Sequence, residues 1–440
     1  MNMLNKLIQQ DLNHVWHPCS YMKDFEQHPP LIVKHATGSY IHTDQGIIID
    51  AISSWWCKSL GHGHPAVIAN IQNQLSKFEH VISANTTHPA IVDLAKELSD
   101  ISKLQHIYFA SDGSSAVEIA MKLAIHASQL KGYTSRKQFI ALSNSYHGET
   151  LGTLSVSDLG VYKKPFSHFN IPCHFLNPMP YMSSESDPLW KDSDAYWPEI
   201  VQQLDRLKHE TYAILVEPIV QGAGGMKCYS ADFLHKLTNW AKQHDIYLIA
   251  DEIMTGLGRT GQWLASNHAN IQPDMICLSK GLTSGTLPLS CVLIDHAIYD
   301  LFYREHSDGV AFLHSHTYGG NPLAVSAALA TIKTMQVEGI NQQAQELGNC
   351  MRQHFTEILT NTGKLNNMRS IGAIVAADLV GPSDLRIGYQ VAQEAQKLGA
   401  LLRPLGDTLY WLPPLTTEHT TIAALAEITN TAIENVYKKF

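Results

Sequence analysis

The stretch IYLIADEI, residues 246–253, is an apolar run that ends in two acids. A short, continuously apolar run of this kind is typical of a strand buried on both faces of a parallel sheet. Asp251 is therefore predicted at the carboxyl end of a strand, where open α/β sheets bind their ligands. A carboxylate buried there needs a cationic partner, and a protonated pyridine nitrogen is one such partner. For Asp251 alone, a helix cap or a salt bridge to the next loop is an equally simple explanation.

The stretch PDMICLSKG, residues 273–281, is a second apolar run, and it ends at Lys280, 29 residues after Asp251. Because parallel strands end at the same edge of a sheet, Lys280 is expected to enter the same crevice as Asp251. A lysine that is desolvated in a crevice has a lowered pKa, which allows its neutral amine to attack a carbonyl carbon. A lysine that reaches from a strand end into solvent is the alternative, but the pairing of the two strand ends favours the covalent role.

The stretch YFASDGSSAVE, residues 108–118, predicts a strand, a Gly/Ser turn and the start of a helix. The N–H groups of Gly113 and Ser114 would form a phosphate site together with the positive end of the helix dipole. Many helices begin in this way with a capping role only. The stretch is not a nucleotide-binding P-loop, because Lys122 lies too far into the helix and the glycine spacing differs.

Aromatic residues follow or precede small residues at two further places. Tyr146, in Tyr-His-Gly (146–148), follows a strand-like run, and its ring could stack on a planar cofactor. Trp55 and Trp56 follow two serines and could line a slot for an apolar chain. Core packing is the commoner role of aromatic side chains, but the small neighbours favour close approach by a ligand.

Strands and helices alternate through the middle of the chain, which favours an α/β domain with a mostly parallel sheet at 61–324. Within it the clearest strands are expected at 106–110, 213–220, 246–250 and 275–279, and the clearest helices at 114–130 and 231–244. Outside it we expect strands at 31–33, 39–42, 47–50, 374–378 and 409–412, and helices at 322–337 and 340–359. The two ends of the chain, 1–60 and 325–440, are predicted to form a smaller α+β domain together.

The composition argues against several classes of protein. The net charge is -9, and no cluster of lysines and arginines suited to nucleic acid occurs in the sequence. No apolar run approaches the length of a membrane-spanning helix, and the first residues lack the apolar core of a secretory signal. We therefore expect a cytoplasmic protein with no nucleic-acid or membrane partner.

Neither the cysteines nor the paired histidines predict a metal site. The seven cysteines are scattered without a CxxC pair, so neither a disulfide framework nor a zinc knuckle is indicated. His62 and His64 alternate along the chain, as do His314 and His316, but no acidic or cysteine third ligand lies at a helpful spacing. No metal ion is expected.

The order of these motifs resembles that of the class III aminotransferases. The order is Ser-Ser-Trp-Trp (53–56), Gly-Ser before Ala-Val-Glu (113–118), Tyr-His-Gly (146–148), Glu-Pro-Ile-Val-Gln-Gly-Ala-Gly-Gly (217–225), Ala-Asp-Glu-Ile (250–253), Gly-Leu-Gly-Arg-Thr-Gly (256–261), Ser-Lys-Gly (279–281) and Gly-Asn-Pro (320–322). The resemblance extends from His14 to Pro404, and Trp-His-Pro (16–18), the tryptophan pair and Arg-Pro-Leu-Gly (403–406) are its more specific elements. It implies a pyridoxal-phosphate enzyme of fold type I that is a homodimer with active sites at the subunit interface.

The resemblance also implies a role for each candidate residue. Lys280 would hold the cofactor covalently and move protons, and Asp251 would pair with its ring nitrogen. Gly113 and Ser114 would bind its phosphate, joined by His316 and Thr317 of the partner subunit, and Tyr146 would stack on its ring. The residues implied to contact the substrate are Trp55, Tyr146, Arg259, Ser315 and Arg403, where the fork of Arg403 suits a carboxylate.

Within the family, the specific motifs resemble the enzymes that aminate 8-amino-7-oxononanoate to 7,8-diaminononanoate in biotin biosynthesis, with S-adenosyl-L-methionine as amino donor. Three residues depart from the family's pattern: Cys19 replaces a usual tyrosine, Glu149 a frequent aspartate, and Ser315-His316 a usual Gly-Pro. The first and third fall where donor or acceptor would bind and leave the donor open. Lysine as donor to the same acceptor, or another class III ω-aminotransferase reaction, is therefore an alternative. A non-enzymatic scaffold on this fold would be expected to have lost Lys280 or Asp251, and the sequence retains both.

Overall fold

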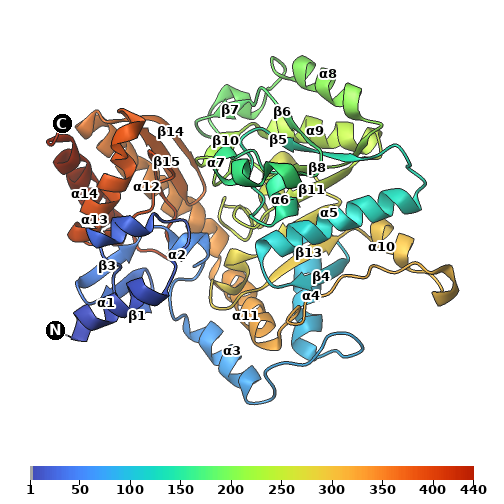
Figure 1. Cartoon of the computed structure of the whole chain (residues 1–440), viewed down its shortest axis with the longest axis horizontal. Helices are drawn as coiled ribbons and strands as arrows, with labels where there is room; N and C mark the ends of the chain where they lie inside the picture. The colour runs from blue at the N-terminus through green and yellow to red at the C-terminus, as the bar shows by residue number, and fades with distance from the viewer. Residues whose placement is uncertain (1–2) are drawn as a thin grey trace.

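The two ends of the chain fold together in the computed structural model, which describes residues 3–440 (Figure 1). In Figure 1 the N-terminal elements, in blue, lie beside the C-terminal ones, in orange and red, and the segments between them form a larger body. The N-terminal and C-terminal parts share a sheet, because β3 (Gly46–Asp50) pairs in parallel with β16 (Ala400–Leu401). The exact boundaries 1–60, 61–324 and 325–440 stay a prediction.

A seven-stranded sheet forms the centre of the larger body. In spatial order its strands are β4 (His106–Ala110), β13 (Ser290–Ile294), β12 (Met275–Leu278), β11 (Tyr247–Asp251), β8 (Thr211–Val216), β5 (Gln138–Leu142) and β6 (Cys173–Leu176). All neighbouring strands are parallel except that β13 runs antiparallel to both β12 and β4. The predicted α/β fold with a mostly parallel sheet is therefore confirmed.

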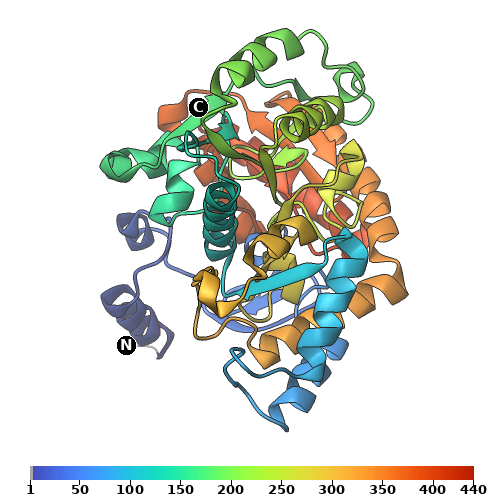
Figure 2. The ribbon, with the colours of Figure 1, turned by 90° about the vertical axis from the view of Figure 1, so that its right-hand side faces the viewer.

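Helices cover both faces of this sheet (Figure 2). On one face α5 (Gly113–Leu130) packs through side chains such as Val117 against Ile249 and Val292. On the other face α4 (Pro89–Ser102) and α11 (Pro322–Glu338) pack through Leu94 and Val325. Since neither face meets water, the strands are apolar on both sides, which explains the continuous apolar runs in the sequence.

One expected strand is wrong in its extent. The run 213–220 does not form a single strand: β8 ends at Val216, and β9 (Val220–Gln221) pairs instead with β10 (Lys227–Tyr229) in a separate small sheet. Pro218 causes the break, because proline has no N–H to donate to the sheet and disfavours continuation of the strand. Ile219 then turns the chain with a positive φ of 70°.

The smaller body contains two further sheets. In the first, β1 (Val33–Thr37), β2 (Tyr40–Thr43) and β3 form an antiparallel meander next to β16. In the second, β14 (Leu365–Ile371), β15 (Ile374–Leu379) and β17 (Thr408–Trp411) are antiparallel. The strand expected at 31–33 begins only at Val33 and continues to Thr37. The core of the smaller body includes Phe355 of α12 (Ile340–Thr362), which packs edge-on against Trp411 with ring centroids 4.8 Å apart.

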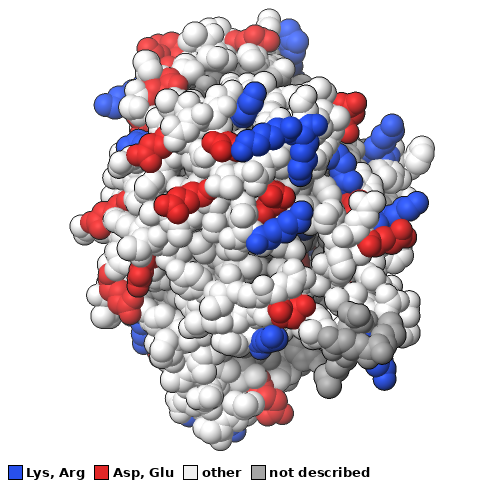
Figure 3. All heavy atoms as spheres, turned by 90° about the vertical axis from the view of Figure 1, so that its left-hand side faces the viewer, with Lys and Arg blue, Asp and Glu red and all other residues white. Residues whose placement is uncertain are grey.

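The remaining helices and strands are α1 (Met3–His14), α2 (Ser53–Trp56), α3 (Pro65–Leu75), α6 (Leu151–Ser155), α7 (Gly160–Lys163), β7 (Tyr181–Met182), α8 (Trp197–Leu207), α9 (Ala231–Gln243), α10 (His296–Phe302), α13 (Ile387–Leu398) and α14 (His419–Tyr437), with short 3-10 turns between them. Among the described residues, none of the helices combines the length and the apolar character needed to span a membrane. On the face shown in Figure 3, acidic and basic side chains are interspersed rather than gathered by sign.

Candidate active site

Asp251 and Lys280 lie close together because their strands are neighbours. Asp251 is the last residue of β11 and stands opposite Cys277 of β12, and Lys280 follows the end of β12. Lys280 begins a 3-10 turn with a positive φ of 43°, and its Nζ lies 4.8 Å from the ring centre of Trp56. Burial lowers the pKa of the Lys280 amine below its usual value, although the negative charges of Asp251 and Glu217 oppose this effect. The amine thereby approaches the neutral form that attacks carbonyl carbon.

The carboxylate of Asp251 is held by a buried histidine. Nδ1 of His147 donates to Oδ2 of Asp251 at 2.8 Å, and the N–H of Ile253 donates to Oδ1 at 3.2 Å. The second bond ties Asp251 to the loop that follows β11, so the carboxylate also has a local structural role. Nε2 of His147 is buried without a hydrogen-bond partner in the described structure. Since an unpartnered buried polar atom is unfavourable, this atom indicates a site that a ligand or water completes.

The start of α5 has the features of an anion site. Asp112 caps the helix by accepting from the N–H of Ser115 at 3.0 Å, which leaves the N–H groups of Gly113 and Ser114 outside this cap. Gly148 lies against Ser114, and a Cβ added to Gly148 would overlap the Ser114 hydroxyl. The close approach of the Gly148 backbone to the Ser114 side chain forms a small cradle at the positive end of the helix dipole.

Tyr146 lies beside the same cradle, half-buried. Its backbone N–H donates to Oε1 of Glu217 at 2.9 Å, and its hydroxyl donates to Glu149 at 2.8 Å. Burial, together with the bond to Glu149, raises the pKa of the Tyr146 hydroxyl far above its ordinary value, so that the phenol stays neutral. These two bonds fix the backbone of Tyr146 and the hydroxyl end of its side chain.

Arg403, Trp55 and Cys19 lie together, with Cys19 close to Tyr162. The guanidinium carbon of Arg403 lies 4.4 Å from the ring centre of Trp55, and its Nη2 donates to the Cys19 carbonyl at 2.9 Å. The Cys19 side chain lies near Tyr162, whose ring centre is 6.0 Å from that of Tyr146. A cationic fork beside an exposed indole face is suited to a carboxylate attached to an apolar chain.

Arg259 is bonded to protein groups beneath the Trp55–Trp56 segment, and its expected contact with substrate stays a prediction. Its guanidinium is buried and donates to the carbonyls of Pro413 at 2.7 Å and Ala373 at 3.3 Å, and to the Ser53 hydroxyl at 3.4 Å. Burial lowers its pKa to about 9. Within the described chain this arginine binds protein carbonyls, and it therefore stabilises the base of the Trp55–Trp56 segment.

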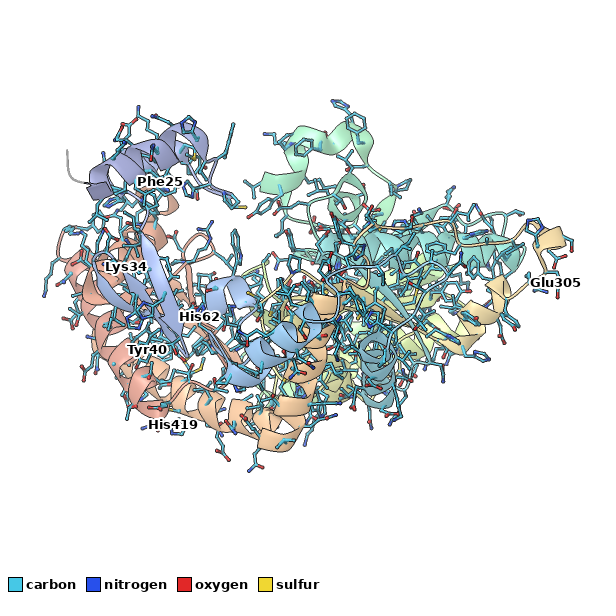
Figure 4. The ribbon with its side chains drawn as sticks, turned by 90° about the horizontal axis from the view of Figure 1, so that it is seen from below. Phe25, Lys34, Tyr40, His62, Glu305 and His419 are labelled. Carbon is cyan, nitrogen blue, oxygen red and sulfur yellow. The ribbon has the colours of Figure 1, made fainter. Side chains whose placement is uncertain are left out.

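Ser315, His316 and Thr317 lie on an extended segment away from the cradle. This segment precedes α11, beyond the projecting part of the chain that carries Glu305 in Figure 4. Nε2 of His316 lies 3.2 Å from Nε2 of His314, which in turn contacts Lys122 at 3.0 Å through Nδ1. The expectation for these three residues concerns the site of a second chain, and it stays a prediction.

Sequence reasoning gave no role to Glu217 and His147, although both occur in the quoted motifs. Glu217 is buried and accepts from the N–H groups of Tyr146 and Gly222, each at 2.9 Å. Burial, reinforced by the charge of Asp251, raises its pKa to about 7. The only signal for such a role was a glutamate directly before Pro218, inside the strand predicted at 213–220.

The chain is similar to known enzymes over nearly its whole length. Residues 21–433 match the family described as aminotransferase class-III. The chain is 36% identical over 437 residues to the adenosylmethionine-8-amino-7-oxononanoate aminotransferase of Helicobacter pylori. The match covers 97% of this chain and 98% of that protein. It is 38% identical over 411 residues to the protein of the same name from Synechococcus elongatus, covering 91% and 94% of the two chains.

Solved structures agree with this relationship. The crystal structure of the adenosylmethionine-8-amino-7-oxononanoate aminotransferase of Methanocaldococcus jannaschii matches with a TM-score of 0.91 and 29% identity, over 98% of this chain and 99% of that one. An amine transaminase of an uncultivated Pseudomonas species, solved in its PLP-bound form, matches with a TM-score of 0.88 and 28% identity, over 96% and 98%. The fold and the site define an aminotransferase that depends on pyridoxal phosphate. The chain belongs to the class III aminotransferase family.

The residues present fit this cofactor. The cradle at Gly113, Ser114 and Gly148 offers N–H groups to a phosphate, and the buried Asp251 offers an anion to a ring nitrogen. Lys280 contributes a buried amine with a lowered pKa. The chemistry of these donors matches the three ends of the cofactor, namely its phosphate, its ring nitrogen and its carbonyl carbon.

Proposed function

We propose that the protein is the aminotransferase of biotin biosynthesis that converts 8-amino-7-oxononanoate to 7,8-diaminononanoate, with S-adenosyl-L-methionine as amino donor. The observation that carries the proposal is the match, over nearly the full length, to relatives that bear this enzyme name. The convergence of Asp251, Lys280 and the helix cradle on one site supports it. Pyridoxal phosphate, when bound, supplies an electron sink for the carbon that gives up or receives the amino group.

Lys280 is proposed as the group that moves protons. In the first half of the reaction its neutral amine takes the proton from the α-carbon of the donor. In the second half it delivers a proton to C7 of the acceptor as that carbon receives the amino group. The lowered pKa of Lys280 suits both tasks, because burial favours the neutral amine that accepts a proton and makes the protonated form a better proton donor.

Asp251 and Gly113-Ser114 are proposed to hold the two other ends of the site. The Asp251 carboxylate, oriented by His147, would keep a ring nitrogen protonated and so stabilise charge that builds up during proton transfer. The N–H groups of Gly113 and Ser114 would fix the phosphate, and Tyr146 would cover one side of the ring.

Arg403 and Trp55 are proposed to recognise the substrate. The guanidinium would bind the acceptor's carboxylate, and the indole face would pack against its methylene chain. A sulfonium donor carries a positive charge that would interact favourably with the faces of Trp55 or Tyr146. Glu149, bonded to the Tyr146 hydroxyl, adds a negative charge near the same place.

We further propose that the enzyme is a cytoplasmic homodimer with active sites at the interface. Leu313 and Tyr318 are 89% and 63% exposed on the extended segment that holds Ser315, His316 and Thr317. Apolar and aromatic side chains exposed together are typical of a surface that another chain covers. Sedimentation velocity of the purified protein tests this, and a monomer at micromolar concentration would argue against it.

The reaction is tested with purified, cofactor-loaded protein and 8-amino-7-oxononanoate, offered S-adenosyl-L-methionine or lysine in parallel. Formation of 7,8-diaminononanoate, measured by mass spectrometry, is expected with S-adenosyl-L-methionine. Formation with lysine alone would change the donor and leave the acceptor standing. Formation with neither would refute the biotin-pathway function while leaving the aminotransferase class intact.

A further inference from the structure

The two active-site tryptophans lie on a left-handed turn. Ser53, Ser54, Trp55 and Trp56 all have positive φ, at 51°, 47°, 77° and 72°. The N–H groups of Trp56 and Cys57 close the turn on the carbonyls of Ile52 and Ser53, at 2.8 and 2.9 Å. Left-handed backbone is unfavourable for every residue with a Cβ, and non-glycine residues rarely adopt it in succession. Such a segment persists only where its surroundings over-determine it.

A single buried carboxylate binds the start of this turn. Oδ1 of Asp50 accepts from the N–H groups of Ile52 at 3.3 Å and Ser54 at 2.9 Å, and Oδ2 accepts from the Ser54 hydroxyl at 2.8 Å. Nε2 of His62 donates to the same Oδ2 at 2.8 Å. The Asp50 side chain is fully buried, so these bonds replace all of its contact with water.

His62 connects the sheet formed by β1, β2, β3 and β16 to the turn. It forms a bridge with Gly38, next to β2, and Figure 4 shows its side chain beside this sheet. Nε2 of His62 also lies 3.3 Å from the Ser54 hydroxyl. Because one nitrogen makes both contacts, the three residues cannot act as a Ser-His-Asp relay, which uses the two ring nitrogens separately. The cluster therefore holds a conformation and activates no nucleophile.

The turn places each indole against a charged group of the active site. The ring of Trp56 lies 4.8 Å from Nζ of Lys280, and its indole N–H donates to the Tyr410 hydroxyl at 3.0 Å. The ring of Trp55 lies 4.4 Å from the guanidinium carbon of Arg403. Adjacent side chains of an extended strand would point to opposite faces, whereas here both indoles line one site.

We propose that Asp50, supported by His62, is a positioning residue of the active site: its carboxylate fixes the left-handed turn that sets Trp55 against Arg403 and Trp56 against Lys280. The inference deepens the proposed function and rests on it for its kinetic readout. Its structural readout does not require activity, because the thiol of Cys57 bonds to the carbonyls of Ser53 and Ser54 at 3.5 and 3.3 Å and so reports on the turn.

The first test is Asp50→Asn, which keeps the size of the side chain and removes its charge and part of its accepting capacity. We expect the KM for the keto-acid acceptor to rise at least tenfold, with a smaller change in kcat. In the cofactor-free protein, the rate at which iodoacetamide labels Cys57 should also rise at least tenfold. Cys173, on the distant strand β6, is the internal control and should keep its rate.

The second test relieves the backbone strain at Ser54 and asks whether the turn recovers. Ser54→Gly removes the steric cost of the positive φ at that position, so adding it to Asp50→Asn should restore both readouts to within about threefold of wild type. Ser76→Gly is the matched control, because Ser76 ends α3 with an ordinary φ of -68°. The rescue should be absent when Ser76→Gly is combined with Asp50→Asn.

If Asp50→Asn does not fold, His62→Ala tests the proposal instead, since it removes the imidazole's contacts with Asp50 and Ser54 and leaves the carboxylate. It should speed Cys57 labelling about threefold or more, whereas His64→Ala, which removes a side chain in no contact with the turn, should not. Labelling of Cys57 and a KM both within twofold of wild type in Asp50→Asn, or equal rescue by either glycine, would overturn the proposal. A wild-type protein without transaminase activity would refute the proposed function, and the labelling result would still decide the role of Asp50.

Discussion

Replacing Gly148 by alanine tests the phosphate cradle. The added Cβ would overlap the Ser114 hydroxyl and lie 2.9 Å from the Thr153 hydroxyl, and Gly148 itself has a φ of +126°. A residue with a Cβ in this region of backbone conformation costs about 1–3 kcal/mol. Ser114 lies at the helix start and cannot retreat far, because α5 is packed on the central sheet.

The displaced Ser114 should lose the hydrogen bond to the phosphate that we propose for it. A hydrogen bond to a charged group contributes about 1.5–3 kcal/mol, so the dissociation constant for pyridoxal phosphate should rise roughly tenfold to a hundredfold. Titration of the cofactor-free protein, followed by visible absorbance, gives this constant. The melting temperature of the same cofactor-free protein measures the backbone strain separately.

Gly160→Ala is the matched control, because a Cβ added at Gly160 meets nothing within 4 Å. This variant should bind the cofactor as the wild type does. If Gly148→Ala binds pyridoxal phosphate within twofold of the wild-type constant, the cradle formed by Gly113, Ser114 and Gly148 is not the phosphate site.

Three further predictions concern charged groups of the site. Arg403→Lys removes the two-pronged contact to a carboxylate and should raise the acceptor's KM about tenfold with little change in kcat; an unchanged KM in steady-state kinetics would place the carboxylate elsewhere. Asp251→Asn should lower kcat by about two orders of magnitude or more while the cofactor still binds, and a kcat within tenfold of wild type would argue against the ring-nitrogen pairing. Glu217 has a folded pKa of about 7 against an ordinary 4.5, so its contribution to stability is complete below pH 4.5 and is lost as the pH rises through 7, by about 3 kcal/mol. Urea unfolding at pH 5 and pH 8 should therefore show Glu217→Gln gaining on the wild type by about that amount at the higher pH, and an equal difference at both values would contradict the buried, protonatable acid.

The sequence predicts the ends of β11 and β12 well, because both faces of the sheet are buried, whereas it misses the end of β8 at Val216. The apolar runs before Asp251 and Lys280 allow only a buried strand, and parallel pairing then brings the two residues to one edge. The start of α5 is equally local, since Asp112 and Gly113 determine the cap and the turn. These features depend on a few consecutive residues and on the order of the elements.

Other features depend on contacts between distant parts of the chain. The guanidinium of Arg259 donates to the carbonyl of Pro413, 154 residues away, and the motif around Arg259 does not predict this contact. The left-handed turn at Trp55 follows from Asp50 and His62, and no propensity of serine or tryptophan predicts it. The pKa of Glu217 follows from burial, which no pattern around residue 217 reveals.

Reduction with borohydride decides whether Lys280 holds the cofactor. Borohydride converts the linkage between pyridoxal phosphate and its lysine into a stable secondary amine, and peptide mass spectrometry then locates the added group. We expect the phosphopyridoxyl group on Lys280 in the wild type, and none at a stoichiometric level in Lys280→Ala. A stoichiometric adduct on another lysine, such as the half-buried Lys58, with Lys280 unmodified, would contradict the assignment of the active site.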